Sequence, residues 1–140
     1  MNSIAIAPQA LNTSTAKNAS ELAGRILLSA LFLISGLGKI GAYSGTAAYM
    51  ASQGVPGALL PLVIATEVLG AAAIIAGWRT QIVAFLLAGF TLLSALIFHN
   101  NLADQIQAIM FFKNVAITGA FLLLVANGSG AWSLDRRAGR

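Results

Sequence analysis

The sequence contains no cysteine and only one histidine, and charged residues make up 9% of its 140 positions. Without cysteine the chain has no disulfide, no thiol redox motif, no thiolate metal site and no iron–sulfur cluster. The single histidine, His99, excludes a haem held between two histidines of one chain. No phosphate-binding loop, serine-hydrolase elbow or zinc-protease motif is present. The residues therefore predict no metal site and no autonomous catalytic motif, which leaves enzymatic activity open.

Hydrophobic residues dominate what is present. They make up 58% of the chain, and the mean hydropathy is +0.83. Soluble domains carry about 25% charged residues, so the composition predicts an integral membrane protein whose surroundings are the lipid bilayer. The net charge is +4, but the basic residues form no stripe with interleaved aromatics. Nucleic acid is therefore not expected as a partner.

Four stretches are long and apolar enough to cross a bilayer, which takes about 20 helical residues. The short connections between them predict an all-α, up-down-up-down bundle of four transmembrane helices. A segment at 42–53 is too polar to span and predicts a short amphipathic helix between the first two spans. The transmembrane domain is expected at 21–130, with spans at about 21–40, 59–77, 81–99 and 107–126.

The two ends of the chain differ from the spans. Residues 1–20 are small and polar and are expected to form a disordered cytoplasmic tail, while residues 131–140 form a basic one. Lysine and arginine gather near the N-terminus, in the turn after the second span and at the C-terminus. The other two loops hold neither residue after Lys39. By the positive-inside rule, both termini are expected in the cytoplasm.

The second span contains one charged residue, Glu67, near its middle. A charge at mid-bilayer costs about 2.5–3.5 kcal/mol on insertion scales, so this carboxylate needs a proton, a cation or a wet cavity. Lys113 lies roughly 6 Å from the midplane of its own span and Arg25 roughly 9 Å. We expect Lys113 to be the principal partner of Glu67, with Arg25 or Lys39 as alternatives. We also expect Arg25 to be buried.

These side chains predict a polar network with two interpretations. It fixes only helix packing, because polar residues commonly hold membrane helices together, or it lines a pocket for a quinone-like or proton-coupled ligand. An interfacial structural role is the alternative for His99, and contact with the membrane surface is the alternative for Lys39. The pocket candidates are Arg25, Lys39, Glu67, His99, Lys113 and Asn114.

Several motifs, taken in order, resemble the DoxX family of small bacterial inner-membrane proteins, particularly its YphA-like branch. Arg25 precedes an apolar run, and Glu67 is followed by Gly70. The longer motifs are SGLGK at 35–39, YMASQGVP at 49–56, GWRT at 77–80, FFKNVAITGAFLLL at 111–124 and GSGAWSLDRR at 128–137. The resemblance covers about residues 22–137. It implies four transmembrane helices in a bacterial inner membrane.

Some members of this family are linked to thiosulfate:quinone oxidation or to oxidative-stress complexes. The resemblance therefore implies an accessory or quinone-interacting subunit of a redox-linked membrane system, at most part of a quinone-linked oxidoreductase. Quinone and a redox partner protein are the candidate partners, no covalent cofactor is expected, and a homo-oligomer is left open. Two alternatives remain: a small proton-coupled transporter component in which Glu67 carries the proton, and a structural scaffold without ligand.

Overall fold

The computed structural model describes residues 7–140, with side chains from residue 13 onward. This part of the chain is helical and contains no strand. The elements in order are α1 (Ala7–Gly41), α2 (Tyr43–Ser52), η1 (Gly57–Leu59), α3 (Leu60–Ala76), α4 (Thr80–Phe98), α5 (Gln105–Asn127) and α6 (Leu134–Arg137). The prediction of an all-α protein is confirmed.

Four helices in the described part are long and apolar enough to cross a membrane, as the sequence predicts. They are α1, η1 with α3, α4 and α5, and the last three begin and end within about two residues of their expected bounds. The first helix differs, because it begins at Ala7 whereas the sequence predicts its start at residue 21. Pro8 lies in its first turn, where a proline is tolerated, and no glycine follows until Gly24. Residues 1–6 lie outside the described part.

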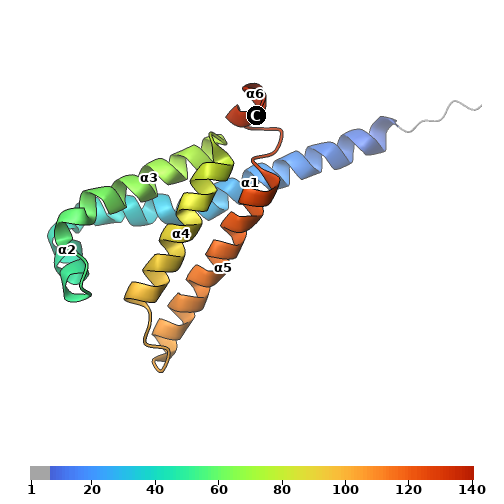
Figure 1. The fold of residues 1–140 in the computed structure, drawn as a ribbon. Coiled ribbons are helices and arrows are strands. Elements are labelled where there is room, and N and C mark those ends of the chain that lie inside the picture. The colour runs from blue at the N-terminus through green and yellow to red at the C-terminus, as the bar shows by residue number, and fades with distance from the viewer. Residues whose placement is uncertain (1–6) are drawn as a thin grey trace, which may run out of the picture.

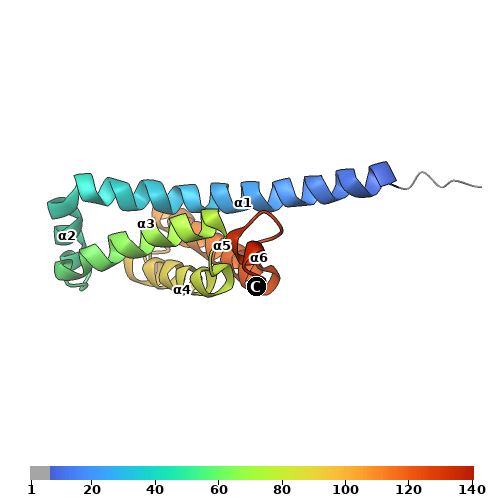
Figure 2. The same cartoon turned by 90° about the horizontal axis from the view of Figure 1, so that it is seen from above.

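The spanning helices form two antiparallel pairs. Helix α1 packs mainly against α3, and α4 packs mainly against α5. Figure 1 shows the two pairs crossing, with α2 joining α1 to α3 at one end of the bundle. Seen from above, α1 continues well beyond the other helices on its N-terminal side (Figure 2). The predicted short helix between the first two spans is α2.

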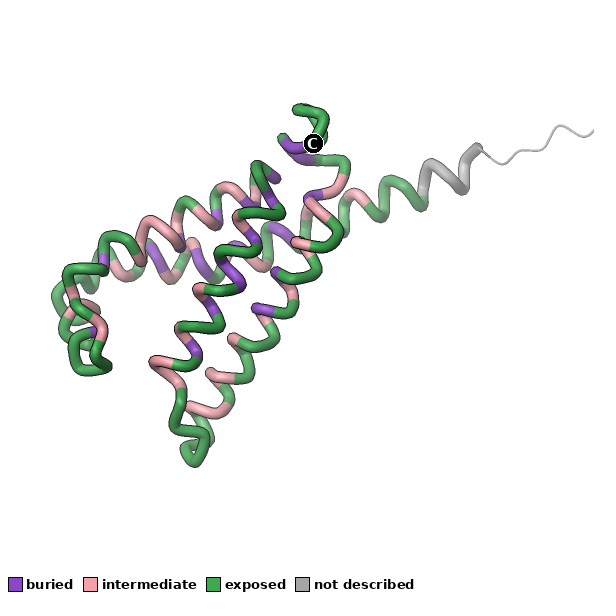
Figure 3. Tube along the Cα trace, viewed as in Figure 1, coloured by how far each residue is buried: buried purple, intermediate pink, exposed green. Residues whose placement is uncertain are grey.

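The core lies where the two pairs meet. Phe32 of α1 and Phe121 of α5 contact edge to face, with ring centroids 5.3 Å apart. The other buried members of this cluster are Ala71, Ile74, Ala84, Leu87 and Ala88. In Figure 3, buried residues recur on the facing sides of the helices, while much of each outer side is exposed. This exposed surface is rich in leucine, isoleucine and phenylalanine, as expected for helices in contact with lipid.

Two glycines allow the helices of this core to approach closely. A Cβ atom at Gly36 of α1 would lie 2.7 Å from Val68 Cγ2 of α3, which is closer than packed carbon atoms come. A Cβ atom at Gly70 of α3 would lie 2.9 Å from Leu87 Cδ2 of α4. Small residues at such positions are how membrane helices gain packing contacts. Gly36 therefore sets the distance between α1 and α3 beside Glu67.

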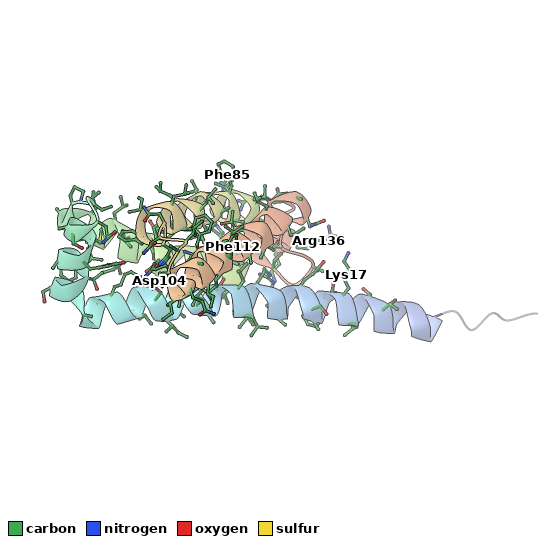
Figure 4. The ribbon with its side chains drawn as sticks, turned by 90° about the horizontal axis from the view of Figure 1, so that it is seen from below. Lys17, Phe85, Asp104, Phe112 and Arg136 are labelled. Carbon is green, nitrogen blue, oxygen red and sulfur yellow. The ribbon has the colours of Figure 1, made fainter. Side chains whose placement is uncertain are left out.

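The C-terminal segment, residues 128–140, folds back onto the turn between α3 and α4 (Figure 1). The N–H of Asp135 donates to the carbonyl of Gly77 at 2.8 Å. Its carboxylate accepts from the N–H groups of Arg79 at 2.7 Å and Thr80 at 2.8 Å. Asp135 thereby caps the start of α4 from 55 positions away. The expected basic tail is thus a folded part of the bundle. Figure 4 shows Arg136 and Lys17 at this end and Asp104 toward the other.

Candidate functional site

An ion pair joins α1 and α3 inside the bundle. Lys39 Nζ lies 2.9 Å from Glu67 Oε2 and 3.0 Å from Glu67 Oε1. The same ammonium group donates to Ser35 Oγ at 2.6 Å, and Ser35 Oγ donates to Glu67 Oε1 at 3.2 Å. Ser35 and Lys39 are four residues apart, which places both side chains on one face of α1. The local sequence therefore presents a hydroxyl and a cation together to one carboxylate.

The predicted pairing of Glu67 with Lys113 is wrong. Lys113 is an exposed residue of α5, and its Nζ lies 3.3 Å from Met110 Sδ. The prediction used the position of each residue along its helix. That position gives the depth of a side chain in the membrane, but it does not give which helices pack side by side. Because α3 packs against α1 and α4, the cation that reaches Glu67 comes from α1.

The two partners differ in exposure. The Glu67 side chain is 7% exposed, whereas that of Lys39 is 24% exposed. The ion pair lowers the free-energy cost of placing the Glu67 carboxylate among apolar helices. Lys39 and the Ser35 hydroxyl both donate hydrogen bonds to that carboxylate. What remains accessible of the pair is mainly the lysine.

The accessible side of Lys39 faces a cavity of about 360 Å³ between the two helix pairs. This volume lies within the range of about 300–1,000 Å³ typical of small-molecule sites. Its lining is mainly apolar and includes Leu31, Phe32, Met50, Phe90 and Ile97. The polar side chains in the lining are Ser35, Lys39, Thr46, Tyr49, Glu67, Thr91, Ser94, His99, Lys113 and Asn114.

The end of this cavity is framed by α2 and the end of α4. Tyr49 stacks on Phe98 with ring centroids 5.6 Å apart. His99, directly after α4, has its Nδ1 atom 2.9 Å from Oε1 of Gln107. The aromatic contact joins α2 to the end of α4, and the hydrogen bond joins the end of α4 to the start of α5.

Five of the six candidate residues predicted from the sequence line this one cavity: Lys39, Glu67, His99, Lys113 and Asn114. Arg25 does not. Sequence reasoning missed the five other polar lining residues, because hydroxyl groups are common in and beside apolar helices: Ser35, Thr46, Tyr49, Thr91 and Ser94. The signal that could have identified Ser35 is its spacing of four residues from Lys39.

Arg25 belongs to the opposite end of the bundle. Its side chain is buried, as predicted. Nη1 donates to the carbonyls of Ile74 at 3.2 Å and Ile75 at 2.9 Å, and Nη2 donates to the carbonyl of Trp132. The last carbonyls of a helix lack partners within that helix. Arg25 therefore satisfies the end of α3 and fastens the C-terminal segment to it.

The Asp135 carboxyl supports the same end of the bundle. Burial raises its pKa, but hydrogen bonds from Thr80 and Arg79 and the charge of Arg140 lower it by more. The net effect is that the pKa of Asp135 lies below its ordinary value, so the capping carboxylate is ionised at neutral pH.

Comparison with known proteins gives a consistent result. The DoxX family model matches residues 20–100. Inner membrane protein YqjF of Escherichia coli K12 is 50% identical over 115 residues, covering 82% of this chain and 88% of that protein. Inner membrane protein YphA of the same organism is 42% identical over 123 residues, covering 83% of this chain and 88% of that protein. No solved structure matches the chain.

The matched residues hold α2, α3, α4 and most of the membrane part of α1, and thus the whole Ser35–Lys39–Glu67 cluster. Both relatives are inner-membrane proteins by name, and the structure supplies four helices able to span a membrane. The chain is therefore a multi-pass inner-membrane protein that belongs to the DoxX family.

Proposed function

We propose that the cavity beside Lys39 and Glu67 binds a membrane-soluble quinone, and that the protein is a quinone-interacting accessory subunit of a redox-linked membrane system. The observation that carries this proposal is a polar cluster opening into a mainly apolar cavity between spanning helices. A quinone combines an apolar tail with ring carbonyls that accept hydrogen bonds. A site for such a ligand needs an apolar lining for the tail and hydrogen-bond donors for the ring carbonyls in the same cavity.

The donors needed for the ring carbonyls are present. Lys39 lines the cavity, but its three donors are already directed to Ser35 Oγ and to the two Glu67 oxygens. The Ser94 hydroxyl and the Asn114 amide also line it, and neither has a hydrogen-bond partner among the side chains and backbone of residues 13–140. Polar groups in an apolar environment gain free energy when a ligand satisfies them. The Ser94 and Asn114 side chains therefore favour a ligand that carries carbonyl oxygens.

In this function the chain binds the quinone, and a partner protein carries out the electron transfer. The sequence has no cysteine pair that could exchange electrons. Electrons would reach or leave a bound quinone through a redox partner protein. An accessory role in a larger membrane system is consistent with these properties.

A short-chain quinone should raise the melting temperature of the purified protein in nanodiscs, because a ligand that binds only the folded state stabilises it. Ser94→Phe, which fills the cavity, should abolish the shift. Leu123→Phe makes a matched change on an exposed position of α5 and should retain it. Equal shifts in all three proteins would indicate partition into lipid and would contradict the proposal.

We further propose that both termini lie in the cytoplasm. The C-terminal segment and α1 meet at one end of the bundle through Arg25 and Trp132. The chain has eight Lys and Arg residues, and all except Lys39 and Lys113 fall in α1 no later than Arg25, in the α3–α4 turn or in the C-terminal segment. A reporter fused after Arg140 should be active only in its cytoplasmic form; a periplasmic signal would overturn this orientation.

A further inference from the structure

Lys113 is a cation within a spanning helix, and no carboxylate of the described residues forms an ion pair with it. All four acidic residues of the chain fall in the described part. Each is engaged elsewhere: Glu21 with Lys17, Glu67 with Lys39, Asp104 with the N–H of Gln107, and Asp135 with the N–H groups of Arg79 and Thr80. The chain itself therefore supplies no anion for Lys113.

The position of Lys113 makes the lack of a counter-ion costly in free energy. It lies eight residues after the start of α5, roughly 12 Å along the helix axis. Its ammonium group is within hydrogen-bonding distance of Met110 Sδ, at 3.3 Å, and a thioether sulfur is only a weak acceptor. A cation within the apolar region of a membrane is expensive unless it meets an anion or water. An anionic group beside Lys113 would therefore be stabilised strongly.

The cavity lined by Lys113 has an excess of positive charge. Apart from Tyr49, whose phenol is uncharged at neutral pH in its ordinary form, its ionisable lining residues are Lys39, Glu67, His99 and Lys113. Lys39 and Glu67 neutralise each other, so one positive charge remains when His99 is neutral. The Asn114 amide, next in sequence to Lys113, adds hydrogen-bond donors. The rest of the lining is mainly apolar.

We infer that the cavity selects an anionic amphiphile, with Lys113 contacting the negative charge and the apolar lining holding the tail. This inference rests on the proposed function and narrows it. Among quinones, the site favours one whose ring carries a negative charge, such as a hydroxyquinone anion, over a neutral quinone of the same size. The competing explanation is that Lys113 only reaches toward the membrane surface. Neutral and anionic ligands would then bind alike.

The experiment compares two probes that differ by one ionised hydroxyl: 2-decyl-1,4-naphthoquinone and 2-decyl-3-hydroxy-1,4-naphthoquinone, the second an anion at neutral pH. Binding is measured by calorimetry on the full chain in phosphatidylcholine nanodiscs, whose lipid has no net charge. The anion should bind about tenfold tighter to the wild type, which corresponds to ~1.4 kcal/mol. Lys113→Met should remove this preference, so that the two quinones bind to the variant with equal affinity.

Two further variants separate charge from fold. Lys113→Arg keeps the charge and should keep the preference for the anion. Arg79→Met removes a cation outside the cavity and should also keep it. A preference that persists in Lys113→Met would overturn the role of Lys113, as would its loss in Arg79→Met.

The outcomes distinguish the inference from the proposed function. Equal affinity of the two naphthoquinones for the wild type would overturn the anion preference while supporting quinone binding. Dodecanoate serves as a third probe that carries a negative charge without a quinone ring. Lys113-dependent binding of dodecanoate with no binding of either quinone would support the anion site and overturn the quinone proposal. Binding of none of the three would overturn both.

Discussion

Replacing Glu67 by glutamine is expected to lower the free energy of unfolding by up to about 3–5 kcal/mol, because it leaves the Lys39 ammonium without its counter-ion. Lys39→Met leaves the opposite defect, a carboxylate whose side chain is only 7% exposed. The Ser35 hydroxyl alone cannot compensate either charge. Both single variants should therefore unfold more readily than the wild type in detergent.

The double variant Glu67→Gln, Lys39→Met should recover much of this loss, since no unpaired charge remains. A double-mutant cycle measures the coupling between the two residues directly. The matched control is the cycle of Glu67 with Lys113, which should be additive because Lys113 makes no contact with Glu67. Additive losses for Lys39 together with coupling to Lys113 would show that the ion pair described above is not the one present in the membrane.

Arg25→Met is expected to cost about 3–5 kcal/mol. It removes the donors to three carbonyls, those of Ile74, Ile75 and Trp132, and hydrogen bonds to a charged group contribute about 1.5–3 kcal/mol each without adding fully. It should also loosen the C-terminal segment. Melting temperature and the rate of tryptic cleavage after Arg136 and Arg137 measure the two effects.

Arg79→Ala is the control for this prediction. Its side chain is exposed in the turn between α3 and α4, and surface substitutions usually change stability by less than about 0.5 kcal/mol. Only its backbone N–H contacts Asp135, and alanine keeps that group. Equal melting temperatures for the Arg25 and Arg79 variants would show that Arg25 does not anchor the C-terminal segment.

The spans were predictable because a bilayer requires long apolar helices with satisfied backbones. The partner of Glu67 was not predictable. The sequence gives the depth of each residue in the membrane, but it does not give which neighbouring helix its side chain faces. Lys39 lies near the end of its span and therefore resembles an interfacial lysine. Its long side chain lies beside Ser35, one turn earlier in α1, and reaches Glu67.

The folded C-terminal segment was also beyond prediction. Residues 128–140 show no apolar periodicity that would indicate packing. They are held by polar contacts near the end of α3 and the start of α4. The Asp135 carboxylate accepts from the N–H of Thr80, and Arg25 donates to the carbonyl of Trp132. One local signal was available: Ser133 caps α6 by accepting from the N–H of Arg136 at 3.2 Å.

The most direct test of a ligand site at Lys39 and Glu67 is to identify, by native mass spectrometry, what stays bound when the protein is extracted from its membrane in intact bilayer discs. The expected result is an adduct with the mass of a quinone on the wild type and on Leu123→Phe, absent from the cavity-filling Ser94→Phe. A wild-type protein without any quinone adduct, or the same adduct on Ser94→Phe, would contradict quinone binding in this cavity.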